Sequence, residues 1–208
     1  MSIVTFNRIA FGYNGEDDLL FHDFSLSVGK GEKIAIKSDS GTGKTTLLRL
    51  LLGFEQPVSG EIRFNGTAIS ENNYTEIRRA TAWLPQDLNI GDGTVKQILQ
   101  RPFEFVHNRN RMPETDQVRL ILEELSLSPG LLEKPLRDLS TGQRQRVGLA
   151  LCHLLDRPLL LLDEPTSALD RSSKQKAANL LLSDPNKTVI STTHDPFWLE
   201  LCDEIIEL

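Results

Sequence analysis

One short segment near the N-terminus constrains the fold more than any other part of the 208-residue chain. A β-prone stretch, KIAIK at residues 33–37, runs into the glycine-rich loop SDSGTGKTT, and a leucine-rich stretch with helical character follows at residues 45–54. A strand, a loop of small residues and a helix in this order let backbone N–H groups turn inward around an anion, and a helix N-terminus favours negative charge. The order therefore predicts a phosphate-binding loop in an α/β chain.

The loop carries side chains suited to a nucleotide with a divalent cation. In this pattern the lysine meets the β- and γ-phosphates and the following hydroxyl meets Mg²⁺, which here are Lys44 and Thr45. Ser38 stands where the pattern G-x-x-x-x-G-K-[ST] has glycine, which costs roughly 1 kcal/mol if that position needs a positive φ and nothing if it does not. The predicted nucleotide-binding residues are Ser38, Asp39, Ser40, Gly41, Thr42, Gly43, Lys44, Thr45 and Thr46.

A second strand-like stretch ends in two acidic residues. Residues 159–162 are four consecutive leucines, followed by Asp163 and Glu164. An apolar run of this kind is typical of a parallel strand buried on both faces, and ligands bind at the carboxyl ends of such strands. Asp163 is therefore expected at Mg²⁺, usually through water, and Glu164 is expected to polarise an attacking water. The alternative is a buried strand followed by two solvated acids in a turn.

Composition limits the classes of protein that fit. Hydrophobic residues make up 39% and charged residues 25%, as in ordinary globular proteins, and 23 Lys+Arg against 29 Asp+Glu give a net charge of −6. This charge argues against a general nucleic-acid binder. The two cysteines form no CxxC pair, no secretory signal is evident, and the apolar runs fall far short of the roughly 20 residues that cross a bilayer. A cytoplasmic chain is expected.

The rest of the chain alternates between strand-like and helix-like segments, which indicates a largely parallel sheet. Strands are predicted at residues 3–11, 24–28, 61–64, 188–192 and near the C-terminal EIIEL, and helices at residues 142–155, 171–182 and after Pro196. From about residue 88 to 138 the pattern is helical instead. Within it, residues 115–127 place four apolar side chains on one face, with Thr115 or Asp116 as the N-cap, and Pro102 and Pro113 interrupt the region.

Between the two phosphate-related motifs lies LSTGQ at residues 139–143, followed by RQRVGLA. With these residues the chain resembles the nucleotide-binding domain of ATP-binding cassette (ABC) proteins, which carry LSGGQ where this chain has Thr141 at the first of the two glycines. The resemblance covers essentially the whole chain, with the motifs in the family's order. It implies a P-loop NTPase fold with a mostly parallel central sheet, an N-terminal antiparallel β part and an inserted helical subdomain. Residues 1–87 and 139–208 would form the ATP-binding core, and about 88–138 the helical subdomain, of one domain.

The resemblance also implies roles for residues outside the two motifs. Tyr13 would stack on adenine, with Phe11 as the alternative that the residues do not exclude. Gln86, in WLPQD, would sense Mg²⁺ and the γ-phosphate, and Asp170, in SALD, would reach across a dimer. His194, in STTHD, would touch the γ-phosphate and stabilise it.

The reaction implied is the attack of water on the γ-phosphate of ATP, with Mg²⁺ as cofactor. Glu164 would be the general base, and Lys44, Gln86 and His194 would complete the catalytic set. The family's head-to-tail dimer implies two ATP molecules at its interface. Ser140, Gly142 and Gln143 of one subunit would then close over the γ-phosphate bound by the other subunit.

The resulting functional hypothesis is the energy-coupling ATPase subunit of a bacterial-type transporter. Its partners would be a second copy of the chain and a membrane permease in a separate chain, which would dock between Gln86 and the helical segment and keep the ATPase at the inner face of the membrane. No nucleic acid is expected. A faint similarity to cassettes of metal (iron) export does not fix the substrate. The alternatives are a soluble ABC ATPase acting on DNA or ribosomes, and a regulatory ATP-binding module that hardly hydrolyses.

Overall fold

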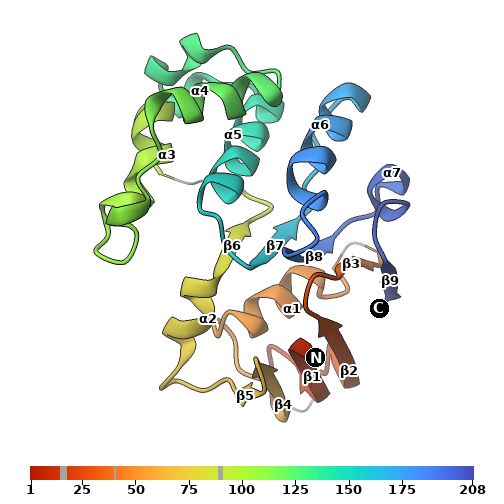
Figure 1. The fold of residues 1–208 in the computed structure, drawn as a ribbon. Helices are drawn as coiled ribbons and strands as arrows, with labels where there is room; N and C mark the ends of the chain where they lie inside the picture. Colours follow the sequence, from red (N-terminus) through yellow and green to blue (C-terminus); the bar gives the residue numbers. More distant parts are fainter. Residues whose placement is uncertain (15–17, 40, 89–90) are drawn as a thin grey trace.

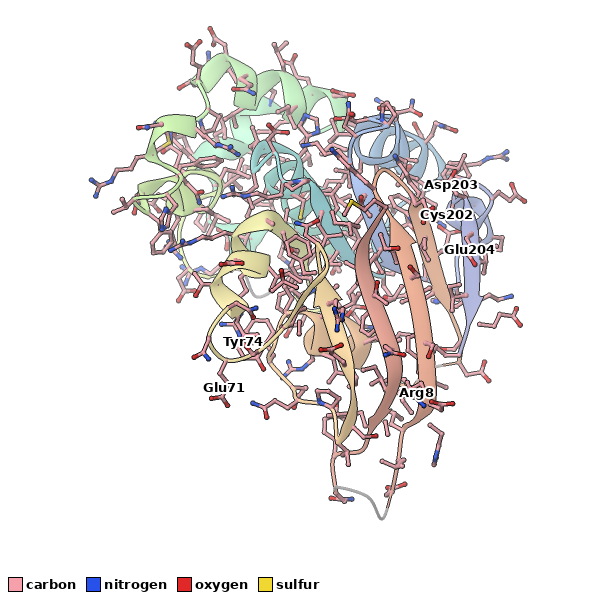
Figure 2. The ribbon with its side chains drawn as sticks, turned by 60° about the horizontal axis from the view of Figure 1, so that its bottom comes forward. Arg8, Glu71, Tyr74, Cys202, Asp203 and Glu204 are labelled. Atoms are coloured by element: carbon pink, nitrogen blue, oxygen red, sulfur yellow. The ribbon has the colours of Figure 1, made fainter. Side chains whose placement is uncertain are left out.

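The centre of the protein is a five-stranded sheet in which every described strand pairing is parallel. The computed structural model describes residues 1–14, 18–39, 41–88 and 91–208. In spatial order the strands are β6 (Thr81–Leu84), β7 (Leu159–Asp163), β8 (Thr188–Thr192), β3 (Lys33–Lys37) and β9 (Glu204–Glu207). The predicted fold class, with a mostly parallel central sheet, is confirmed. Figure 2 shows Cys202, Asp203 and Glu204 at the side of the molecule away from the helices that follow β6.

A second, antiparallel sheet packs below the first (Figure 1). Its order is β2-β1-β4-β5, with β1 at Ser2–Phe11, β2 at Phe21–Gly29, β4 at Ser59–Phe64 and β5 at Thr67–Ala68. This sheet is the predicted N-terminal β part. The long β1 pairs with both β2 and β4, and its alternating apolar side chains face the core.

Two groups of helices flank the parallel sheet. Helix α1 follows the glycine-rich loop and lies between the two sheets, whereas α5 and α6 cover the opposite face of the parallel sheet (Figure 1). The bounds are α1 (Lys44–Leu51), α2 (Tyr74–Ala80), α5 (Thr141–Leu154), α6 (Arg171–Leu182) and α7 (Pro196–Leu199).

The described residues between β6 and α5 are helical or irregular, and they extend away from the antiparallel sheet (Figure 1). They form α3 (Val95–Glu104), α4 (Thr115–Glu124) and the 3₁₀ turns η2 (Arg109–Arg111), η3 (Pro129–Glu133) and η4 (Leu136–Asp138). Thr94 caps α3 through a reciprocal pair of hydrogen bonds with Gln97.

The leucine run of β7 divides the core between the two faces of the sheet. Leu160 and Leu162 pack with α3, α4, α5 and α6, whereas Leu159 and Leu161 pack with α1 and the antiparallel sheet. Because successive side chains of a strand point to opposite faces, an unbroken apolar run fits only a strand covered on both sides.

Three local expectations are wrong. Helix α1 ends at Leu51 rather than at residue 54, because Gly53 takes a left-handed conformation with φ of 67° that stops the helix. The N-cap of α4 is Glu114, without a side-chain hydrogen bond, so neither Thr115 nor Asp116 serves. Pro102 lies inside α3 near its end, where few turns remain to be disturbed.

Candidate functional site

The glycine-rich loop connects β3 to α1, and its two glycines have conformations that other residues rarely adopt. Gly43 is the N-cap of α1 with φ of 101°, and Gly41 has φ of 87°. A Cβ atom added to Gly43 would lie 2.6 Å from both Leu20 Cδ2 and Phe21 Cζ. Glycine at position 43 is therefore required twice, by the backbone and by the close approach of neighbouring side chains.

Ser38 does not adopt a positive φ, so the conformational cost considered for a non-glycine residue at this position does not arise. Its hydroxyl forms a hydrogen bond with the hydroxyl of Thr42, which in turn donates to the carbonyl of Asp39 at 2.9 Å. These bonds stabilise the turn of the loop across the positions before the helix. Ser40, also predicted to bind nucleotide, lies outside the described residues.

The ammonium group of Lys44 lies within the loop. Its Nζ donates to the carbonyl oxygens of Ser38 at 2.6 Å and Asp39 at 2.8 Å. The lysine and the N-terminus of α1 thus place a positive charge and the positive end of a helix at this loop, which is the arrangement that an anion needs.

Thr45 and Asp163 come together although 118 positions separate them in the sequence. The hydroxyl of Thr45 donates to Asp163 Oδ2 at 2.6 Å, and Thr192 Oγ1 donates to Oδ1 of the same carboxylate. Within the described part of the chain, no three or more His, Cys, Asp or Glu side chains form a metal-binding group. One carboxylate and one hydroxyl fit Mg²⁺, which prefers oxygen ligands and is usually bound by few protein groups, waters and substrate phosphates.

Glu164 follows directly and has a left-handed backbone with φ of 50°, rare for a residue with a side chain. Its N–H donates to the carbonyl of Thr192 at 2.9 Å, and the residue is only 8% exposed. The carboxylate Oε1 lies 3.0 Å from Nδ1 of His194, whose side chain is 74% exposed. The buried carboxylate of Glu164 therefore borders solvent on the side where His194 lies.

Gln86 follows β6, the strand that pairs with β7. Leu84 of β6 pairs with Leu162 of β7, and Gln86 and Glu164 each come two residues further along the chain, beyond the carboxyl ends of the two strands. Gln86 also lines a cleft of about 730 Å³ between the end of β6 and the helical segment, together with Asp87, Leu88, Gly91, Asp92, Gly93, Thr94, Gln97, Pro135, Leu136, Arg137, Thr141 and Arg144.

The two candidate aromatic residues differ sharply in exposure. Tyr13 is 66% exposed, and its hydroxyl forms a 2.8 Å hydrogen bond with Thr46 Oγ1 behind the loop. Phe11 is only 4% exposed and packs against the rings of Tyr13 and Phe21. Of the two residues, Tyr13 has the ring that is open to solvent, as stacking on a base requires.

The LSTGQ segment forms the start of α5. Ser140 is the N-cap, accepting from the backbone N–H of Gln143 at 3.3 Å, while Gln143 Oε1 accepts from the backbone N–H of Ser140 at 3.0 Å. Thr141 is the first residue of the helix and is exposed. Asp170 caps α6, and the hydrogen bond from the N–H of Ser173 lowers the pKa of its carboxyl group.

The sequence reasoning overlooked Gln145. It is 4% exposed in α5, and its side-chain amide bonds to the backbone of Glu164 and Ala168. The signal that could have found it is a glutamine on the helix face that also carries Leu149 and Cys152, both buried. A polar side chain on such a face needs a hydrogen-bond partner.

The fold and the loop together define an α/β nucleotide-binding protein of the P-loop type. The family model described as "ABC transporter" matches residues 21–167, and the chain belongs to that family. This match confirms the predicted class of protein, an ATP-binding ABC transporter ATPase.

Several proteins are similar to this chain over nearly its whole length. A probable ABC transporter ATP-binding/permease protein of Haemophilus influenzae is 33% identical over 99% of this chain, which spans only 38% of that relative's length. The energy-coupling factor transporter ATP-binding protein EcfA1 of Staphylococcus aureus is 31% identical over 93% of this chain and 73% of its own length. The dimeric ATP-binding cassette MJ0796 bound to ADP and Pi has a TM-score of 0.84 at 25% identity, covering 99% of this chain and 94% of its own.

Among the residues that the structure describes, no helix is both long and apolar enough to cross a membrane.

Proposed function

We propose that this chain hydrolyses ATP by direct attack of water on the γ-phosphate. The observation that carries the proposal is the contact of Glu164 with His194. Glu164 directly follows Asp163, whose carboxylate accepts a hydrogen bond from Thr45. A general base must lie close to the reacting water, and a buried carboxylate at the end of a parallel strand meets this need.

Each side chain of the candidate site would have one task. Lys44 and the N–H groups around it would bind the β- and γ-phosphates, Tyr13 would stack on the base, and His194 would donate to the γ-phosphate oxygens. Thr45 and Asp163 would hold Mg²⁺, with Gln86 as a further oxygen donor. Bound there, the ion would neutralise charge that develops on the phosphate oxygens. Glu164 would accept the proton of the attacking water.

We further propose that the site is completed by a second copy of the chain, arranged head to tail. The start of α5 supports this, because Ser140 and Gly142 lie at the exposed N-terminus of a helix of 14 residues, which favours an anion. Asp170 would contact the partner subunit at the same interface. The structure of MJ0796, a relative in fold, is described as a dimer.

We propose that the transport partner is a membrane permease encoded as a separate chain, and that it docks in the 730 Å³ cleft beside Gln86. The ATP-binding core would then comprise residues 1–87 and 139–208. The helical subdomain, about residues 88–138, would form the other side of the cleft that receives the permease. The name of the relative EcfA1 describes an ATP-binding protein of a transporter, which supports a role for this chain as the ATPase of a transporter at the inner face of the membrane.

The rate of phosphate release against protein concentration tests the composite site. A monomer would hold an incomplete site, so we expect the rate to rise faster than linearly until the dimer saturates. The control is Glu164→Gln, which should bind ATP and release almost no phosphate. A linear rate from a species that light scattering shows to be monomeric would contradict the proposal.

A further inference from the structure

Gln145 lies at the interface between α5 and the segment that leaves β7. Its Nε2 donates to the carbonyl oxygen of Glu164 at 2.7 Å, and its Oε1 accepts from the backbone N–H of Ala168 at 2.9 Å. The amide is buried, and its Nε2 also donates to Ser167 Oγ at 3.4 Å, so both of its ends are matched to protein groups rather than to water. A buried side chain with both ends satisfied fixes the position of its partners.

A second contact joins the same two parts of the chain. A Cβ atom added to Gly142 would lie 2.6 Å from the carbonyl oxygen of Ala168, so only a glycine allows this approach. The first turn of α5, capped by Ser140, therefore lies directly against the segment that begins at Glu164. Movement of one of these parts must be accommodated by the other.

The bond from Gln145 reaches the residue whose backbone is strained. Glu164 has φ of 50°, and its carbonyl also accepts from the N–H of Ser167 at 3.3 Å and from the hydroxyl of Ser167 at 3.2 Å. The carbonyl orientation and the carboxylate direction are set by the same backbone, so the donors on the carbonyl also help to aim the carboxylate. The bond from Gln145 is the shortest of the three and the one that comes from α5.

We propose that Gln145 is a positioning residue that couples the N-terminus of α5 to the orientation of Glu164. The inference rests on the proposed function, in which Ser140 and Gly142 meet the ATP of the partner subunit while Glu164 acts on the ATP of its own. Gln145 then links the two sites of the dimer within one chain. Closure of α5 over one γ-phosphate would set the base for the other.

The test uses Gln145→Met, which keeps the volume and removes all three hydrogen bonds of the side chain, to Glu164, Ser167 and Ala168. We expect kcat to fall on the order of 10- to 100-fold, since small misplacement of a catalytic group costs this much. KM and the dissociation constant for ATP should stay within about twofold, because Gln145 touches no part of the loop that binds the nucleotide. Gln175→Met, the same change at an exposed position of α6, is the matched control and should match the wild type.

A double-mutant cycle with Ser140→Ala separates coupling from a loss of stability. In the wild-type background Ser140→Ala should lower kcat, and in Gln145→Met it should lower kcat far less, because the link to Glu164 is already broken. Independent, multiplying effects of the two changes on kcat would overturn the inference, as would a Gln145→Met protein with the kcat of the wild type.

Two further measurements keep the outcome interpretable. Thermal unfolding identifies a variant that does not fold, in which case Gln145→Leu takes its place, because it also lacks the donor to Glu164 and adds no buried charge. The wild type is assayed alongside. A wild type that hydrolyses ATP together with a fully active folded variant contradicts this inference alone, whereas a wild type without ATPase activity contradicts the proposed function.

Discussion

Oε1 of Glu164 lies 3.0 Å from Nδ1 of His194, and the two residues follow neighbouring parallel strands, β7 and β8. Asp163 pairs with Thr192 in the register of these strands, so both side chains emerge at the same edge of the sheet. This geometry joins the candidate base to an imidazole that is largely open to solvent.

Replacing His194 should slow the reaction without weakening nucleotide binding. His194→Ala removes the partner of Glu164 and a donor to the γ-phosphate, and loss of one such donor costs about 10²- to 10³-fold in kcat. Steady-state phosphate release and an equilibrium titration with ATP measure the two effects. The exposed His107→Ala serves as control. Equal losses of kcat and of ATP affinity would assign His194 to binding instead.

Tyr13 should contribute to nucleotide affinity through its ring. Tyr13→Ala should weaken ATP binding by roughly 1–3 kcal/mol, the range of base–aromatic stacking. Tyr13→Phe keeps the ring and loses only the bond to Thr46, so its affinity should stay close to that of the wild type. Titration with a fluorescent ATP analogue compares the two variants. Equal weakening by both would show that the hydroxyl, rather than the ring, supports binding.

The glycine-rich loop should respond in opposite ways at two positions. Ser38→Gly relieves no strain and removes the bond to Thr42, so we expect no gain in ATP affinity and a stability loss of about 1 kcal/mol. Gly43→Ala meets both a φ of 101° and the Leu20 and Phe21 side chains, so ATP binding should be lost or strongly weakened. Calorimetric titration tests both, and tighter binding by Ser38→Gly would contradict the account.

Asp195 should make stability depend on acid pH. Burial by itself raises the pKa of Asp195, but hydrogen bonds from Lys174 and Thr166 outweigh it and leave the pKa below its ordinary value. A lowered native pKa means that the unfolded chain binds the proton first, so the contribution is fully present above about pH 4 and is lost as the pH falls through the native value.

Chemical denaturation across pH measures this contribution. Asp195→Asn should unfold more readily at pH 7, and its free energy of unfolding should change less than that of the wild type between pH 4 and pH 2. Asp116→Asn, at a carboxylate whose side chain is 86% exposed, is the control. Parallel pH curves for the wild type and Asp195→Asn would contradict the prediction.

Much of the fold followed from patterns that carry their own physical cause. The leucine run of β7 fits only a strand covered on both faces, and the loop before α1 combines glycines with a lysine at fixed spacing. These features are enough to predict the parallel sheet and a common Mg²⁺ site for Thr45 and Asp163, whose side chains the structure joins by a hydrogen bond. The chemistry of the loop is local in sequence, which is why it could be predicted.

Other parts depended on contacts that a sequence does not display. Helix α2 and the four-residue β6 went unpredicted, because β6 is recognisable only through its pairing with β7. The choice between Tyr13 and Phe11 is made by burial, and Gln145 acquires its role only when α5 packs on Ala168. The end of α1 was misplaced because Leu52 and Phe54 continue its apolar pattern past Gly53.

The composite site is tested most directly by the mass of Glu164→Gln in solution. Without the base, ATP should persist in the closed dimer, so size exclusion with light scattering in Mg-ATP should give twice the mass of one chain, and one chain's mass without nucleotide. Adding Ser140→Ala should weaken the dimer while leaving ATP binding intact. A Glu164→Gln protein that binds Mg-ATP and stays monomeric at every concentration would contradict the claim that the isolated chain completes its own site by pairing.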